Sequence, residues 1–266
     1  MALLQVAEAE VRFGGVHALR GVNLEVEPGA VTGLIGPNGA GKTTLFNAIC
    51  GLQGLNGGQI SLEGTSMNGL RPHQRARLGI ARTFQRLEVF GSLSVRENVL
   101  ASAEIRRRWS RDHSDASANA DGVLALVGLS HLADRSADTL PTGQARLLEL
   151  ARSLATRPRL LLLDEPSSGL DDTESEELGD LLVQLAGAGM AVLLVEHDMG
   201  LVMRVCSQIN VLDFGAVLTV GCPADIRADE RVRAAYLGAV DTHEPPLADP
   251  TAAHPLLAAS GAGADG

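Results

Sequence analysis

One stretch near residue 40 constrains the fold of this chain more than any other part of it. It consists of Gly36, Pro37, Asn38, Gly39, Ala40, Gly41, Lys42, Thr43 and Thr44, and the part from Gly36 to Thr43 fits the phosphate-binding pattern Gly-x-x-x-x-Gly-Lys-Thr. A strand-like run precedes this phosphate loop at residues 31–35, and a helix-like run follows it at residues 44–50. Glycines let successive backbone N–H groups point at phosphate oxygens, and the start of a helix adds the positive end of its dipole. The loop therefore predicts an α/β core that binds a phosphorylated ligand.

The lysine of the phosphate loop is the only lysine in the chain, and every other basic residue among the 22 Lys and Arg is arginine. A planar guanidinium is too broad for a pocket built of backbone amides, whereas a compact ammonium fits. We therefore expect Lys42 to contact the β- and γ-phosphates of a nucleotide. The neighbouring hydroxyl of Thr43 is expected to bind a magnesium ion.

The composition limits the classes of partner. A net charge of −10 and 3% aromatic residues argue against nucleic acid as the main partner. Cys50, Cys206 and Cys222 are scattered without metal-binding spacing, which is typical of reduced thiols in a cytosolic protein. The N-terminus lacks the basic region of a signal peptide, and the apolar runs are too short to span a bilayer. Any membrane role is therefore expected to come through a partner.

The rest of the chain alternates between strand-like and helix-like segments. Strands are expected at residues 3–13, 18–27, 59–62, 80–84, 160–163 and 190–195, and a hairpin at 209–220. Helices are expected at residues 71–78, from 94 onward, and at 123–129, 143–156, 173–185, 198–205, 224–227 and 231–237. Continuously apolar runs such as 160–163 are typical of parallel strands buried on both faces. Residues 239–266 are rich in Ala, Pro and Gly, carry no Lys or Arg, and are expected to be disordered.

Polar residues follow three of these expected strands. Asp164 and Glu165 follow the strand at 160–163, and the carboxyl end of a parallel strand is where ligands bind. Asp164 is expected to hold magnesium, directly or through water, and Glu165 to accept a proton from the attacking water. His197 follows the strand at 190–195 and is expected to bridge the γ-phosphate and that water. Gln85 follows the strand at 80–84, and its amide is expected to reach both the magnesium and the water.

Together these motifs resemble the ATP-binding subunits of ABC transporters, over residues 3 to about 238. Residues 36–44 look like the Walker A loop, and residues 160–165 look like Walker B. Gln85 looks like the Q-loop glutamine, and His197 like the switch histidine. Asp171 ends a stretch similar to the D-loop, and Phe13 falls where the family places an aromatic ring under the adenine.

One motif departs from the family pattern. The signature Leu-Ser-Gly-Gly-Gln is replaced by Leu-Pro-Thr-Gly-Gln at residues 140–144. By resemblance, Thr142, Gly143 and Gln144 are expected to contact nucleotide. The signature serine is absent, and the sequence leaves open whether Thr142 supplies its hydroxyl.

The resemblance implies an α/β fold of the ABC type: a RecA-like P-loop core, an antiparallel β subdomain and a helical subdomain inserted at about residues 85–157. One ABC ATPase domain would then span residues 1–238. The resemblance also implies a head-to-tail dimer, homo- or heteromeric, with ATP and Mg²⁺ at its interface. Further expected partners are transmembrane permease subunits and, indirectly, a solute-binding protein. The expected location is peripheral, on the cytoplasmic face of the plasma membrane.

The sequences of residues 34–41, 81–85, 195–199 and 235–238 are similar to those of the longer ATPase subunit of branched-chain amino-acid importers. The expected function is therefore ATP hydrolysis that powers import of branched-chain or related amino acids. The alternatives are an ABC ATPase for urea, other amides or lipid export, and a soluble ABC ATPase outside transport. An inactive nucleotide-binding regulator is disfavoured because Glu165 and His197 are both present.

A basic segment, Arg-Arg-Arg-Trp-Ser-Arg, occupies residues 106–111. Runs of like charge are usually solvated, so we expect a linker between two helices. The alternative is contact with anionic lipid head groups beside a membrane partner.

Overall fold

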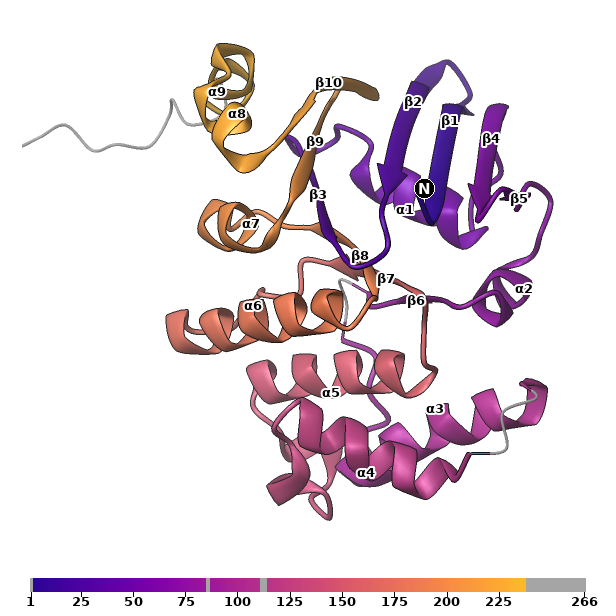
Figure 1. Cartoon of the computed structure of the whole chain (residues 1–266), viewed down its shortest axis with the longest axis vertical. Helices are drawn as coiled ribbons and strands as arrows, with labels where there is room; N and C mark the ends of the chain where they lie inside the picture. Colours follow the sequence, from indigo (N-terminus) through magenta and orange to yellow (C-terminus); the bar gives the residue numbers. More distant parts are fainter. Residues whose placement is uncertain (1, 85–86, 111–113, 238–266) are drawn as a thin grey trace, which may run out of the picture.

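The computed structural model describes residues 2–84, 87–110 and 114–237. In these ranges the chain forms two sheets with helices packed around them (Figure 1). The predictions for Gln85 and for the tail at 239–266 concern residues outside these ranges. None of the described helices is long and apolar enough to cross a membrane.

The larger sheet has six strands in the order β10-β9-β3-β8-β7-β6. Their bounds are β3 (Val31–Ile35), β6 (Ile80–Arg82), β7 (Leu160–Asp164), β8 (Ala191–Val195), β9 (Gln208–Asp213) and β10 (Ala216–Gly221). The strands from β9 to β6 run parallel, and β10 pairs with β9 as an antiparallel hairpin. Every residue of β3, β7 and β8 is buried, as expected for a parallel sheet covered on both faces. Residues that follow these strands therefore meet at one edge of the sheet.

The smaller sheet has four antiparallel strands in the order β2-β1-β4-β5. They are β1 (Leu4–Phe13), β2 (Val16–Val26), β4 (Gly57–Leu62) and β5 (Thr65–Ser66). Helix α1 (Lys42–Cys50) buries Phe46 and Ile49 in one apolar cluster with side chains of both sheets. This shared core fixes α1, and hence the phosphate loop before it, against both sheets.

Helices cover the other face of the larger sheet. Side chains of α5 (Thr142–Ala155), α6 (Asp172–Gly187) and α7 (Met199–Val205) share a second apolar cluster with that face. Helices α3 (Val95–Trp109) and α4 (Ala116–Leu126) pack with α5 at one end of the molecule (Figure 1). These helices lie within residues 85–157, where the inserted subdomain is expected, and its division from the core stays a prediction. The remaining helices are α2 (Pro72–Arg77), α8 (Pro223–Ala228) and α9 (Glu230–Leu237), with short 3₁₀ turns at Ser130–Leu132 and Ala137–Thr139.

The structure corrects the bounds of one predicted helix and the interpretation of the basic segment. The helix expected at 123–129 is α4, which begins at Ala116 because the side chain of Asp115 caps it and ends at Leu126, just before Gly128 adopts a positive φ of 74°. The basic segment is not a linker from residue 106 to 109, because Arg106 to Trp109 form the last turn of α3. Basic side chains are favourable there, since they face the negative end of the helix dipole.

Candidate active site

The phosphate loop joins β3 to α1, and two of its glycines approach other parts of the backbone closely. Gly36 has φ +154°, and a Cβ there would lie 2.0 Å from the carbonyl oxygen of Leu212. Gly41 has φ +109°, and a Cβ there would lie 2.7 Å from the backbone of β2. The N–H of Gly215, in the β9–β10 turn, donates to the carbonyl oxygen of Ala40 at 2.9 Å. The loop is therefore held in shape by β2 and by the β9–β10 hairpin.

Lys42 folds its side chain over the phosphate loop. The residue is 7% exposed, and Nζ donates to the carbonyl oxygens of Gly36 at 2.5 Å and Pro37 at 3.0 Å. Burial lowers the pKa of Lys42, while the carboxylates of Glu165 and Asp164 act in the opposite direction. The ammonium is thus fixed beside the loop amides, where an anion bound by those amides would meet it.

Glu165 and His197 come from loops that follow two paired strands. Asp164, the last residue of β7, pairs with Val195, the last residue of β8, so the two loops start side by side. His197 Nε2 lies 2.8 Å from Glu165 Oε1. Glu165 has φ +51°, a conformation that is uncommon for a non-glycine residue. A carboxylate in contact with an imidazole is suited to accept and orient a proton of a water molecule.

Glu196 organises both loops, and the sequence did not single it out as a site residue. It is 2% exposed, and its carboxylate accepts from the N–H of Ser167 at 2.8 Å and from the N–H of His197 at 3.0 Å. One carboxylate therefore ties the loop that carries Glu165 to the loop that carries His197. The available signal was a charged residue placed between a buried strand and a candidate catalytic histidine.

Asp164 and Thr43 provide oxygen donors for a metal ion. Asp164 is 4% exposed, and its Oδ2 accepts a hydrogen bond from Arg82 Nη2 at 2.8 Å. Thr43 is the second residue of α1 and lines the cavity described below. Carboxylate and hydroxyl oxygens suit Mg²⁺, which proteins usually hold through one or two carboxylates together with substrate phosphates. The residues present therefore fit Mg²⁺, and Arg82 is a contact of the site that the sequence did not predict.

A cavity of about 370 Å³ lies over the phosphate loop. Its lining comprises Val16, His17, Ala18, Arg20, residues 38–44, Glu165, His197, Phe214 and Gly215. The cavity thus brings the phosphate loop together with Glu165 and His197. Phe13, the expected adenine contact, does not line it and is 51% exposed at the end of β1. Val16 and Phe214 stand at the cavity instead, and both are largely exposed.

The candidate residues of the altered signature motif, Thr142, Gly143 and Gln144, lie outside this cavity. Thr142, Gly143 and Gln144 begin α5, next to the first turn of α6. A Cβ on Gly143 would lie 2.6 Å from a carboxylate oxygen of Glu174, so a larger residue there would require the Glu174 side chain to move. Asp171 caps α6 by accepting from the N–H of Glu174 at 2.8 Å. The signature and D-loop residues therefore form one surface, separate from the phosphate loop of the same chain.

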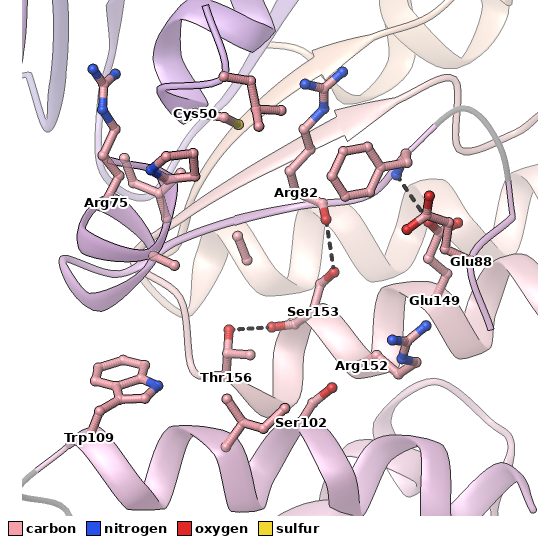
Figure 2. A pocket seen from close by; sticks show the side chains of 17 residues that line it. Cys50, Arg75, Arg82, Glu88, Ser102, Trp109, Glu149, Arg152, Ser153 and Thr156 are labelled. Atoms are coloured by element: carbon pink, nitrogen blue, oxygen red, sulfur yellow. Dashed lines mark hydrogen bonds between the residues drawn. The ribbon is translucent and has the colours of Figure 1, made fainter. Parts of the chain in front are cut away.

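A second cavity, of about 350 Å³, lies between α2, β6, α3 and α5, and we call it the groove (Figure 2). Trp109 and Ile105 line it from α3, and Phe84 lines it from the segment after β6. On α5, Glu149 accepts from the N–H of Phe84 at 3.0 Å, and Arg146 donates to the carbonyl oxygen of Phe84 at 3.0 Å. Burial raises the pKa of Glu149. Two side chains of α5 therefore hold the backbone of Phe84, immediately before residue 85, by hydrogen bonds.

Comparison with known proteins identifies the class of this chain. Residues 19–168 match the family described as "ABC transporter", and residues 216–242 match the family described as "Branched-chain amino acid ATP-binding cassette transporter". The chain belongs to the ABC transporter family, and the predicted ABC-type nucleotide-binding fold and ATPase class are confirmed.

Three relatives illustrate the match. The chain is 42% identical to the high-affinity branched-chain amino acid transport ATP-binding protein BraF of Pseudomonas aeruginosa, over 89% of this chain and 98% of BraF. Its fold is similar to the ADP conformation of MJ1267, an ATP-binding cassette of an ABC transporter, with a TM-score of 0.81, 30% identity, and coverage of 90% of this chain and 99% of that one. It is also similar to the dimeric structure of the bacterial ABC transporter cassette MJ0796, with a TM-score of 0.73, 25% identity, and coverage of 83% and 98%.

Proposed function

We propose that this chain is the ATP-hydrolysing subunit of an importer for branched-chain or related amino acids. The observation that carries the hydrolytic part is the contact of Glu165 with His197, 2.8 Å apart at the cavity over the phosphate loop. The match of residues 216–242 to the branched-chain family supports the choice of cargo. That match favours amino acids over urea, other amides or an exported lipid.

Each residue of the site has a separate proposed role in ATP hydrolysis. The loop amides and Lys42 bind the phosphates, and Glu165 accepts the proton of the attacking water while His197 holds that water through its ring. Asp164 and Thr43 would hold Mg²⁺, which when bound neutralises charge on the phosphates. Glu196 keeps Glu165 and His197 at their separation, because its carboxylate binds both of their loops.

The working site is proposed to form between two cassettes. Thr142, Gly143, Gln144 and Asp171 lie away from the phosphate loop of their own chain, and a head-to-tail partner would bring its copies to that loop. The dimeric cassette among the similar structures supports this assembly.

The groove is the proposed docking surface for the membrane permease. Its apolar side chains, Phe84, Ile105 and Trp109, are at least partly exposed, and it borders the backbone that precedes Gln85. A permease segment seated there would touch the segment that leads to the active site, so docking and hydrolysis would affect each other. The chain would then sit peripherally on the cytoplasmic face of the plasma membrane, beside an importer that takes cargo from a solute-binding protein.

Uptake of labelled solutes by membrane vesicles tests the proposal. Vesicles that contain the wild-type chain should accumulate labelled leucine in the presence of ATP, and should not accumulate labelled urea. Vesicles with Glu165→Gln should not accumulate leucine, whereas Glu177→Gln, an exposed position on α6, should behave as wild type. Leucine uptake that persists in Glu165→Gln contradicts the hydrolytic role, and uptake of urea in place of leucine contradicts the cargo.

A further inference from the structure

Arg82 joins three parts of the active site through one guanidinium. It is the last residue of β6, beside β7. Its Nη2 donates to Asp164 Oδ2 at 2.8 Å, and its Nη1 donates to Asn47 Oδ1 at 2.6 Å. Asn47 lies on α1, the helix that begins at the phosphate loop. The side chains of Arg82 and Asp164 are only 6% and 5% exposed, so this is a buried ion pair.

The position of Asp164 explains why a cation is needed there. A buried carboxylate without a partner is strongly unfavourable, because the protein interior does not replace the water it has lost. Lys42 interacts with Asp164 through its charge, but the hydrogen bonds of its ammonium go to the carbonyl oxygens of Gly36 and Pro37. The guanidinium of Arg82 is therefore the nearest compensating charge in hydrogen-bond contact with Asp164.

The contact between Arg82 and Asp164 is also one that can be exchanged. A single N–H reaches the carboxylate, rather than the two-pronged contact that makes arginine–carboxylate pairs strongest. Arg82 Nε is buried without a hydrogen-bond partner among the described residues. Other contacts would keep the guanidinium in place if Asp164 turned away: Asn47, and the rings of Phe46 and Phe84 with centroids 5.3 and 5.0 Å from Arg82 Cζ.

A metal ion at Asp164 would have few ligands from the chain itself. Among residues 2–84, 87–110 and 114–237, no group of three or more His, Cys, Asp and Glu side chains is placed to hold a metal ion. Most ligands would have to come from the nucleotide phosphates and from water. The positive charge of Arg82 beside Asp164 repels a metal ion that binds without nucleotide. The repulsion is smaller when negatively charged phosphates bind together with the metal.

We propose that Arg82 acts as an internal cation that occupies Asp164 in the metal-free protein and thereby confines metal binding to the nucleotide-loaded state. This role rests on the proposed function, because it requires Asp164 to be a metal ligand. In it Arg82 is a positioning residue, because it acts on the metal site through its contact with Asp164. Arg82 also lines the groove (Figure 2). Phe84, whose ring centroid lies 5.0 Å from Arg82 Cζ, is another lining residue.

Direct titration with Mn²⁺, a spin-active substitute for Mg²⁺, tests the proposal. Free Mn²⁺ is measured by electron paramagnetic resonance with purified full-length protein, with and without a non-hydrolysable ATP analogue. Without nucleotide, Arg82→Gln should bind Mn²⁺ at least about tenfold more tightly than wild type. The reason is that the repulsion between two close cations inside a protein exceeds the free energy that corresponds to a tenfold change in affinity. Arg82→Lys keeps the charge and should bind as weakly as wild type.

The matched control is Arg96→Gln, which also breaks an arginine–aspartate pair, with Asp121 at 2.6 Å between α3 and α4. It should leave Mn²⁺ binding unchanged. The double variant Arg82→Gln/Asp164→Asn should lose the added Mn²⁺ affinity, because the carboxylate that binds the metal is gone.

The outcomes separate this role from the proposed function. If Arg82→Gln binds Mn²⁺ no more tightly than wild type without nucleotide, the role of Arg82 is refuted. If wild type fails to bind Mn²⁺ even with the ATP analogue, the metal site itself is refuted. Should Arg82→Gln be unstable in metal-free buffer, Mn²⁺ must raise its thermal midpoint by more than it raises that of wild type, and an equal shift contradicts the role.

Discussion

Replacing Glu196 by glutamine should both destabilise the fold and slow ATP hydrolysis. The carboxylate has one oxygen for the N–H of Ser167 and the other for the N–H of His197. A glutamine of the same shape has one oxygen and one NH₂ group, so it can satisfy only one of these donors. Its NH₂ group would face the other N–H, which leaves two donors opposed in a buried place.

The size of the effect follows from this loss. A hydrogen bond to a charged acceptor contributes about 1.5–3 kcal/mol, and a buried unsatisfied donor costs about 1–3 kcal/mol. We expect a loss of about 2–3 kcal/mol in the free energy of unfolding, which for a domain of this size lowers Tm by roughly 4–12 °C. Turnover should fall by about 10- to 100-fold, because displacements near 1 Å of catalytic groups have effects of that order.

Differential scanning fluorimetry and a phosphate-release assay measure the two effects on the same protein. Glu177→Gln is the control, since Glu177 is exposed on α6 and makes the same change in charge. Unchanged Tm and unchanged turnover in Glu196→Gln would refute the reasoning. A lower Tm with full turnover would show that Glu196 supports the fold without positioning Glu165 and His197.

Three further predictions address the charged groups of the site and the groove. Glu165→Gln should bind ATP and hydrolyse it about 10²–10⁴-fold more slowly in a phosphate-release assay, because it keeps its shape and loses its basicity; turnover at the wild-type rate contradicts its role as base. Saturating Mg-ATP should protect Lys42, and leave the N-terminal amine labelled, when an amine-reactive reagent is followed by intact-mass measurement; equal labelling of Lys42 with and without nucleotide contradicts the phosphate-loop assignment. Burial raises the pKa of Glu149, so the folded state retains this proton to higher pH than the unfolded state, and stability is lost as the pH rises above the ordinary value of 4.5 through the raised pKa. The Tm of wild type relative to Glu149→Gln should therefore fall over that interval, and a constant or rising difference contradicts the assignment.

Much of the site could be predicted because its residues follow recognisable strands. Residues 191–195 are apolar throughout and form the buried strand β8, and residues 31–35 form the buried strand β3, so the polar residues after them could be placed at one edge of the sheet. The hairpin expected at 209–220 is β9 and β10. The phosphate loop could be recognised from its local pattern alone, although the close contacts of Gly36 and Gly41 are with Leu212 and Ala18, which are distant in the sequence.

The contacts that escaped prediction depend on which strands become neighbours. Arg82 meets Asp164 because β6 pairs with β7, although the two residues lie far apart in the sequence. The role of Glu196 could not be predicted, because it depends on the contact with Ser167 in the loop that follows β7. For Phe13, by contrast, the resemblance predicted a contact with adenine, and the residue does not line the cavity over the phosphate loop of its own chain.

The separation of the phosphate loop from Thr142 has a genetic consequence. In a two-fold dimer of this chain, each catalytic site would combine Lys42 of one copy with Thr142 of the other. A disabling change of Lys42 in one copy and of Thr142 in the other would place both defects in one site and leave the second site whole. The same two changes in a single copy would damage both sites. Two inactivating alleles of one gene could thus complement each other in trans but not in cis, and a transporter built from two different cassettes would lose this symmetry.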